Sequence, residues 1–334
     1  MKESSINELL GLLTTNLVLS GRVGTALSYA SAICKARKIL GNDISLSELF
    51  SPQGIHSCQR SMYAQGLCGN TVSFYMRVLR AIYNKGVNLG ICANLTHLFD
   101  DVYTGIDSTP KRAVSARIFG MLQELELSGK KNLAFSRDLF LLSFSLQGIS
   151  FVDLARLRKS NVSGEFLSYR RAKTGGLITV ALSGFAREII DQYASQAQGS
   201  PYLLPIIKNP DGNTYLQYKS ALRSYNRRLK KLAALAGITD NLTSYVARHT
   251  WATTAQQTNV AIGLIKQAMG HSTEEVTQIY LAGYDHSALL RANEKVLMAA
   301  NVVSHCITGE KKACEAKNEN VSHLRSERHF RLQT

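Results

Sequence analysis

The sequence predicts a mainly α-helical protein with a small antiparallel β-hairpin or sheet, an α+β fold class, in two domains. The length of 334 residues suggests two domains at roughly 100 to 200 residues each. A hydrophobic content of 45% with only 5 prolines is enough for packed cores rather than disorder. Helical periodicity runs through most of the chain, and a period of two residues replaces it only between residues 166 and 182.

Charge and composition exclude several classes of protein. The 39 Lys and Arg residues outnumber the 24 Asp and Glu residues, and the net charge of +15 favours a polyanionic partner. The longest apolar stretches, such as 139–144, are far shorter than the roughly 18 residues that span a bilayer, and the N-terminus lacks the apolar region of a signal peptide. We therefore expect a soluble, cytoplasmic protein with no membrane partner. The spacing of His305, Cys306, Cys314 and His323 matches no common zinc pattern, so no metal ion is predicted.

The first hundred residues have a helical pattern throughout. It is sharpest at 71–85, where Asn70 is expected to cap the N-terminus of a helix and Gly86 to end it. Arg77 and Arg80 lie off the apolar stripe of this helix, three residues apart, and so share one face. That face either contacts phosphates or is an ordinary solvated surface.

A domain boundary is predicted at 105–112, where small and polar residues surround Pro110, which cannot continue a helix. Residues 1–104 then form a helical N-terminal domain and 113–302 a second domain. Residues 303–334 are polar with mixed charge and are expected to form a mobile tail.

The second domain begins with three predicted helices, at 115–127, 137–147 and 151–158. Two strands follow at 166–171 and 177–182, joined by a turn that contains Lys173.

Helices then resume from residue 184. A helix that includes 261–268 is expected to end at Gly270, and Ser272 with Glu275 is expected to form a capping box for the next helix.

Three residues in this C-terminal region have a specific spacing. Arg248 lies in a helix of small residues, His271 follows it by 23 residues, and Tyr280 lies nine residues further on. With the box 277–280, this pattern resembles the C-terminal signature of the tyrosine recombinase (phage integrase) family. The hairpin with Lys173 is similar in position to the lysine hairpin of that family. Within the family, the sequence most resembles integrases of Bacteroidetes mobile elements.

The resemblance implies a fold and a function. The N-terminal domain would be a SAM-like core-binding domain and residues 113–302 the catalytic domain, which together form a C-shaped DNA clamp. The protein would be a site-specific recombinase that cuts and rejoins double-stranded DNA through a 3′-phosphotyrosyl intermediate on Tyr280, with no cofactor. A helix at 287–299 would dock on a neighbouring protomer to give a homotetramer on two DNA sites. Accessory DNA-bending proteins are expected as further partners, and the protein would associate with a bacterial nucleoid.

Each residue type also has a physical reason. A phenol has a pKa of about 10, so a phenolate at pH 7 costs about 4 kcal/mol unless nearby cations lower that value. The fork of Arg248 can hold two phosphate oxygens. Lys173 can protonate the leaving 5′ oxygen as a general acid, and His271 can donate to the phosphate or accept the tyrosine proton.

Two positions depart from the family pattern. Ser150 stands where the family has its first arginine, and loss of one such donor typically costs about 2.7 to 4 kcal/mol. Gln147, one helical turn earlier, could donate a neutral hydrogen bond, whereas Arg156 would point about 240° away. Tyr245 stands where histidine is common, and its phenol can still reach a phosphate oxygen. His249 is expected to be a packed structural residue.

Two basic clusters are predicted to contact DNA phosphates, which position a duplex without reading its sequence. One contains Arg156, Arg158, Lys159, Arg170, Arg171 and Lys173, and the other contains Lys219, Arg223, Arg227, Arg228, Lys230 and Lys231. Two other functions remain open: a DNA-binding accessory protein that kept the fold without the chemistry, and a type IB topoisomerase.

Overall fold

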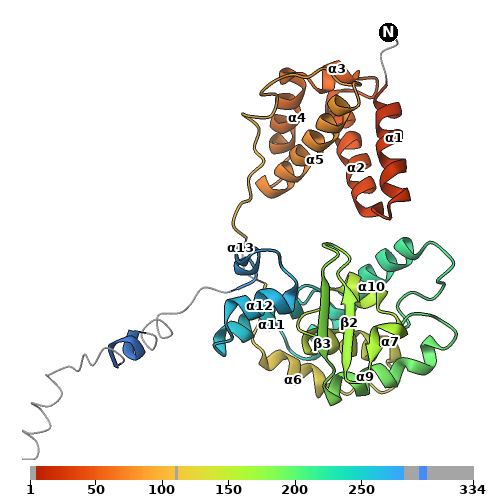
Figure 1. Ribbon diagram of the computed structural model, residues 1–334, viewed down its shortest axis with the longest axis vertical. Helices are drawn as coiled ribbons and strands as arrows, with labels where there is room; N and C mark the ends of the chain where they lie inside the picture. Colours follow the sequence, from red (N-terminus) through yellow and green to blue (C-terminus); the bar gives the residue numbers. More distant parts are fainter. Residues whose placement is uncertain (1–4, 110–111, 282–292, 299–334) are drawn as a thin grey trace, which may run out of the picture.

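The computed structural model describes residues 5–109, 112–281 and 293–298. Two bodies are joined by one connection (Figure 1). Mostly helical elements surround one small sheet, as the sequence predicts. None of the described helices is long and apolar enough to cross a membrane.

The N-terminal body is a helical bundle with its own hydrophobic core. Its elements are α1 (Ile6–Leu19), α2 (Val23–Leu40), α3 (Leu46–Leu49), α4 (Pro52–Ala64) and α5 (Gly69–Asn88). The core is centred on α5, whose buried residues include Val72, Met76 and Leu79. Arg77 and Arg80 lie exposed on the other side of this helix, so they are available to a partner.

The predicted bounds of α5 were wrong at both ends. The helix begins at Gly69 after Cys68, and it continues through Gly86 to Asn88. A Cβ atom on Gly86 would lie 2.5 Å from Cys92 Sγ and 3.2 Å from a methyl group of Leu9. This glycine is therefore required for close packing and does not end the helix.

The connection between the bodies is attached at both ends. Asn70, expected as a cap, instead exchanges two hydrogen bonds of 2.9 and 3.0 Å with the backbone of Asp107. Ser73 donates to the carbonyl of Gly105 at 2.6 Å. On the other side, Val114 N–H donates to Thr250 Oγ1 at 3.1 Å. The first residues of the predicted linker at 105–112 thus pack on α5, and the domain boundary itself stays a prediction.

The second body contains the remaining helices. They are α6 (Arg117–Gln123), α7 (Lys131–Ser145), α8 (Phe151–Arg156), η1 (Lys159–Asn161), α9 (Gly184–Ala194), η2 (Ser195–Ala197), α10 (Thr214–Leu235), α11 (Val246–Gln257), α12 (Ile262–Met269) and α13 (Glu274–Gln278). Helix α7 begins six residues before the predicted start at 137. The prediction missed this start because Lys130, the N-cap residue, makes no side-chain capping hydrogen bond and so gives no signal in the sequence. Helices α6 and α8 are shorter than predicted.

The predicted hairpin is confirmed. Strands β2 (Phe166–Arg170) and β3 (Leu177–Ala181) pair antiparallel, with Phe166 opposite Ala181 and Arg170 opposite Leu177. A two-residue strand, β1 (Val162–Ser163), which was not predicted, pairs with β2 at the end away from the turn. Buried and exposed residues alternate along β2 and β3, so one face of the sheet packs on the core.

Two cores hold the second body together. The larger surrounds α7, which packs against α6, α9, α10 and α11 and is buried on several sides. A smaller cluster joins α11 to α12 and includes Ala252, Ile265, Met269 and Leu281, with Tyr280 packed against it. The C-terminal elements are therefore held against α11 by a few residues.

Candidate active site

Arg248 lies on α11 and is only 2% exposed. Its guanidinium donates from Nη1 to the carbonyl of Gly148 and from Nη2 to the carbonyl of Met269, both at 2.7 Å. Gly148 has φ of +71°, and a Cβ atom there would lie 2.8 Å from Arg248 Cα. The close approach of this loop to α11 therefore requires glycine.

A second arginine, Arg171, is buried in the same site. It follows β2, and its Nη1 donates to the carbonyl of Gly270 at 2.7 Å. Gly270 ends α12 in the left-handed conformation with φ of +60°, as predicted, and a Cβ atom there would lie 2.7 Å from Arg171 Cδ. The negative end of the α12 dipole thus accepts hydrogen bonds from both guanidiniums, at Met269 and Gly270.

These two guanidiniums have no acidic partner within the described residues, where the ion pairs are His97–Asp100 and Arg137–Asp138. The Nε–H groups of Arg171 and Arg248 are buried without a hydrogen-bond acceptor in the same part of the chain. Burial, and then the charge of Arg171, lower the pKa of Arg248. The site therefore holds two buried positive charges with unused donors.

His271 follows Gly270 directly and is also buried. Its Nδ1 lies 3.0 Å from the hydroxyl of Thr277, which itself donates to the carbonyl of Thr273. Nδ1 therefore carries the proton, and Nε2 accepts from Arg248 Nη2 at 3.1 Å. Burial and the charges of Arg248, Arg171 and Lys173 lower the pKa of His271 to about 4, so the ring is neutral at pH 7.

Tyr280 lies just beyond α13, and its ring is packed between side chains of the site. The ring centroid is 4.5 Å from that of His249 and 4.9 Å from that of His271. Arg248 Cζ lies 5.5 Å from the same centroid, within cation–π range. The structure thus brings the three residues of the predicted signature together. His249, expected to be structural only, contacts the Tyr280 ring directly.

The capping residue before α13 differs from the prediction. Thr273, rather than Ser272, is the N-cap and accepts from the backbone N–H of Val276. The helix that precedes Tyr280 therefore begins one residue later than expected. It contains a single short turn before the Tyr280 segment.

The hydroxyl of Ser150 is already hydrogen-bonded within the protein. It donates to Asp153 Oδ2 at 2.6 Å, and Asp153 Oδ1 accepts from Ala172 N–H at 2.7 Å. The serine at the usual arginine position thus helps to anchor the hairpin turn. Gln147 is not one helical turn before Ser150, because α7 has ended and Gln147 has φ of +58°.

Two predicted residues lie at the edge of the site. Tyr245 is 42% exposed at the N-cap of α11, and burial followed by the proximity of Tyr280 raises its pKa. Lys173 is exposed in the hairpin turn, and its charge is one of those that lower the pKa of His271. Both side chains are therefore accessible to solvent, unlike the two buried arginines.

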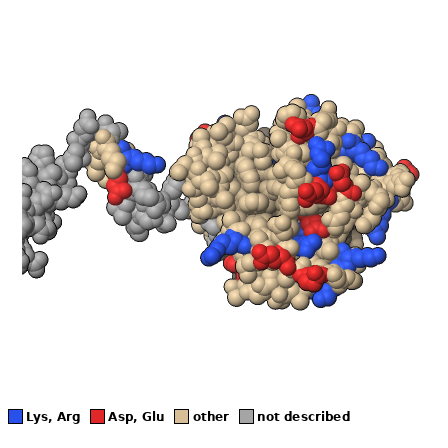
Figure 2. Space-filling model, turned by 90° about the horizontal axis from the view of Figure 1, so that it is seen from below, with Lys and Arg blue, Asp and Glu red and all other residues tan. Residues whose placement is uncertain are grey.

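The predicted DNA-binding arginines are dispersed. Those that lie exposed are Arg77, Arg80, Arg156, Arg158, Arg170, Arg223 and Arg227. Arg171 is instead part of the buried site, and Arg228 is half-buried against a cavity. Figure 2 shows that the face of the second body turned away from the N-terminal body carries acidic and basic side chains together. No single basic patch covers that face.

Sequence reasoning missed three residues of the site. Arg171 was predicted only as one of a cluster that contacts DNA phosphates, although the alternation of the strand, with Leu167 and Tyr169 buried, could have indicated that Arg171 is buried as well. Asp153 and Thr277 accept or share hydrogen bonds with Ser150 and His271, and they follow their partners by three and six residues, so only the first pair has a helical spacing. The described residues include no cluster of His, Cys, Asp or Glu that could hold a metal ion, and 305–323 lies outside them.

Comparisons with known proteins agree with this geometry. The model of the phage integrase family matches residues 131–286. A tyrosine recombinase of Agathobacter rectalis is 38% identical over 58 residues, which are 17% of this chain and 19% of that protein. The chain thus matches less than a fifth of the length of this curated relative.

Solved structures share the fold at low identity. A lambda integrase dimer bound to a core site is 14% identical, with a TM-score of 0.59 over 83% of this chain and 77% of that chain. The Tn1549 transposon integrase in complex with transposon right end DNA is 15% identical, with a TM-score of 0.59 over 88% and 100%. Residues 131–286, which include the signature residues around Arg248, thus belong to the phage integrase family, and most of the chain shares the fold of these solved integrases.

Proposed function

We propose that this chain is a site-specific DNA recombinase in which Tyr280 cuts and rejoins double-stranded DNA. The observation that carries the proposal is a pair of buried guanidiniums, Arg248 beside the Tyr280 ring and Arg171 on the carbonyl of Gly270, neither with an acidic partner in the described residues. An uncompensated buried charge costs several kcal/mol. A site that keeps two of them is built to receive an anion, and the scissile phosphodiester is that anion.

The reaction is a transesterification. The Tyr280 oxygen attacks the phosphorus, the bond from phosphorus to the 5′ oxygen breaks, and Lys173 on the exposed turn protonates the leaving oxygen. Arg248 and Arg171 hold the non-bridging oxygens, with the two Nε–H groups as the donors that are unused without DNA. Arg171 would thereby supply the cation that Ser150 lacks.

His271 accepts the proton of Tyr280 in this scheme. Its Nε2 lone pair accepts from Arg248 Nη2 in the structure, and it becomes available when a phosphate oxygen takes over that one hydrogen bond, while the hydrogen bonds of Arg248 to Gly148 and Met269 remain. The anionic phosphate also offsets the nearby cations that lower the pKa of His271 to about 4, so DNA binding makes the ring a stronger base.

DNA would be held between the two bodies, with exposed arginines of α5 and α10 on its backbone. The relatives with this fold support DNA as the partner, since one was solved as a lambda integrase tetramer bound to a Holliday junction. A tetramer on two DNA sites is part of the proposal. Of the helix expected at 287–299, the described part is helical at 293–298 and exposes Val296, Leu297 and Met298, as docking on a neighbour requires. The rest lies outside the described residues.

Covalent capture tests this proposal. The protein is incubated with nicked duplexes tiled across the DNA that flanks its coding region, because a nick lets the cleaved end diffuse away and traps the intermediate. We expect a denaturant-resistant protein–DNA adduct whose peptide contains Tyr280. Tyr280→Phe should give none, and Tyr245→Phe, which alters the other tyrosine of the site, should keep it.

Two outcomes would replace the proposal. Tight binding of one duplex with no adduct would select the DNA-binding accessory protein, for which the bond between Ser150 and Asp153 provides an argument. Relaxation of supercoiled plasmid that lacks any bound site would select a topoisomerase.

A further inference from the structure

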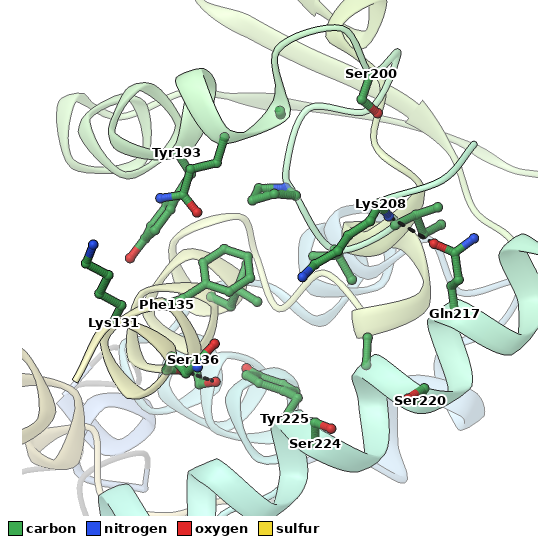
Figure 3. Close-up of a pocket in the computed structure, with 18 of the residues that line it drawn as sticks. Lys131, Phe135, Ser136, Tyr193, Ser200, Lys208, Gln217, Ser220, Ser224 and Tyr225 are labelled. Atoms are coloured by element: carbon green, nitrogen blue, oxygen red, sulfur yellow. Dashed lines mark hydrogen bonds between the residues drawn. The ribbon is translucent and has the colours of Figure 1, made fainter. Parts of the chain in front are cut away.

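The second body contains a large cavity outside the active site. It has a volume of about 1300 Å³ and is bounded by α7, the end of α9, one face of α10 and the loop at 198–210 (Figure 3). Small-molecule pockets usually have volumes of about 300 to 1,000 Å³. This cavity is therefore large enough for a segment of polypeptide.

The cavity lies on the side of α10 away from the active site. Gln217, Ser224 and Arg228 line it and share one face of the helix at about 100° per residue. Asn226, about 160° around the helix from Ser224, accepts instead from the N–H of Ser244, four residues before Arg248. A molecule in the cavity would thus leave the active site free. Arg223 and Arg227, about 100° and 60° around the helix from Ser224, are not among the residues that line it.

Aromatic rings form the inner wall, and one of them has an unused polar group. Tyr225 is 3% exposed and stacks on Phe151 at 4.6 Å, and its hydroxyl forms no hydrogen bond with the described residues. Figure 3 shows this hydroxyl directed toward Ser136, whose own hydroxyl donates to the carbonyl of Asn132. Burial raises the pKa of Tyr225, so the phenol stays neutral and can both donate and accept.

The charged residues that line the cavity are all basic, and the nearby carboxylate of Asp138 is buried behind the lining Tyr193, from whose hydroxyl it accepts a hydrogen bond. Lys131, Lys208 and Arg228 are among the lining residues, which include no Asp or Glu. Figure 3 shows Lys131 and Lys208 on different sides of the aromatic wall. Such a lining complements an acidic ligand. The chain itself is a poor occupant, because its net charge is +15 and its residues 303–334 contain more Lys and Arg than Glu.

We propose that this cavity, the α7–α10 cavity, binds an acidic segment of a partner protein that inserts an apolar side chain against Phe135 and Tyr193. The rings of these two residues meet edge to face with their centroids 4.6 Å apart. An apolar side chain of the partner could pack against both rings in this arrangement. The Tyr225 hydroxyl bonds the backbone of the inserted segment, and the three cations hold its carboxylates. The inference does not depend on the cleavage chemistry proposed for Tyr280.

Binding of defined peptides to the full chain tests this inference. The probe is a fluorescent peptide of about 12 residues, with a central Leu-Phe pair flanked by Glu and Ser residues. Matched peptides carry Gln for every Glu, or Ser-Ser for Leu-Phe. By fluorescence anisotropy, we expect the acidic apolar peptide to bind at least about tenfold more tightly than either matched peptide. Saturating duplex DNA should leave that binding in place.

Variants separate the cavity from general attraction to a basic protein. Ser224→Trp fills the cavity and should abolish binding, and Tyr225→Phe, which keeps the volume, should weaken it several-fold. Arg223→Gln removes one charge from α10 at a residue that does not line the cavity, about 100° around the helix from Ser224, and should have no more than a twofold effect, whereas Lys208→Gln should weaken binding clearly. Thermal unfolding checks that each variant folds. If Ser224→Trp does not fold, the affinity of Tyr225→Phe for the peptide is the deciding measurement. Four results would overturn the inference. They are no binding of the acidic peptide, binding of the Gln peptide with the same affinity, displacement of the acidic peptide by DNA, and unchanged affinity in Tyr225→Phe.

Discussion

The arginines of this protein occur in two environments, buried and exposed, and the two environments suit different functions. Arg171 and Arg248 are buried, and backbone carbonyls at the end of α12 and in the loop before α8 fix their guanidiniums. Arg223 and Arg227 on α10 are exposed. An exposed cation reorients freely and is screened by salt, so it contributes attraction. A buried and fixed cation acts at one position in space, so it can stabilise one phosphate in its transition state.

The largest effect should come from Arg248→Lys. A lysine cannot maintain hydrogen bonds to both Gly148 and Met269 or hold two phosphate oxygens in a fork. We expect the rate of adduct formation to fall by about 100- to 1,000-fold, while affinity for DNA changes little. A reduction below about tenfold would show that burial of this arginine serves the fold rather than the reaction.

Arg171→Gln should have the next largest effect. If Arg171 supplies the second clamp, we expect a loss of about 10- to 100-fold in the rate of adduct formation. Arg170→Gln is the matched control, since Arg170 is adjacent in sequence but exposed. Equal effects of the two substitutions on rate would remove the distinction between buried and exposed arginines in this turn.

Gly270→Ala tests how the buried pair is held. The new methyl group would meet Arg171 Cδ at 2.7 Å in a left-handed backbone conformation, so we expect a loss of about 1 to 2 kcal/mol in the free energy of unfolding. Urea titration measures this loss. Gly176→Ala, where the nearest atom is 3.7 Å away, should cost less than about 0.5 kcal/mol.

The pH dependence of the free energy of unfolding should reflect the buried arginines, because burial and the charges of these arginines lower the pKa of His271. Its pKa is lowered to about 4 in the folded protein from an ordinary value of 6.5, so the unfolded chain binds the proton first as pH falls. This contribution is fully present above pH 6.5 and is lost between about 6.5 and 4, at less than about 1.4 kcal/mol per pH unit. Urea unfolding of the protein and of His271→Asn should differ in slope across that interval and run parallel above it.

The smallest effect belongs to the exposed arginines. Arg223→Gln and Arg227→Gln should each lower the slope of log affinity against log salt by about 0.9 if each contacts one phosphate. The fraction of bound DNA that becomes covalently linked should not change. A change in that fraction at saturating DNA would mean that these residues act on the reaction as well.

The sequence predicted best where local signals and tertiary packing agree. The hairpin has alternating strands and glycines in its turn, and Gly270 both ends α12 and fits against Arg171. The resemblance to the family implied that Arg248, His271 and Tyr280 lie together, and the structure places them so at the ends of the short helices α11, α12 and α13.

It predicted less well where packing overrides a local signal. Gly86 resembles a helix stop but fits beside Cys92 and Leu9 inside α5. Arg171 belongs to a basic run in the sequence, and its burial depends on Gly270, which is 99 residues away. The helical relation assumed between Gln147 and Ser150 also failed, since the left-handed conformations at Gln147 and Gly148 separate α7 from α8.

Ser150 has a consequence for engineering. Its hydroxyl is hydrogen-bonded to Asp153, which in turn holds the backbone at Ala172, next to Arg171. In a Ser150→Arg variant, which restores the residue that the family pattern implies, we expect the Asp153 carboxylate to turn toward the new cation and to release the backbone at Ala172, next to Arg171. If Arg171 supplies the second phosphate clamp as proposed, we expect an exchange of one arginine for the other to require changes at positions 150 and 171 together.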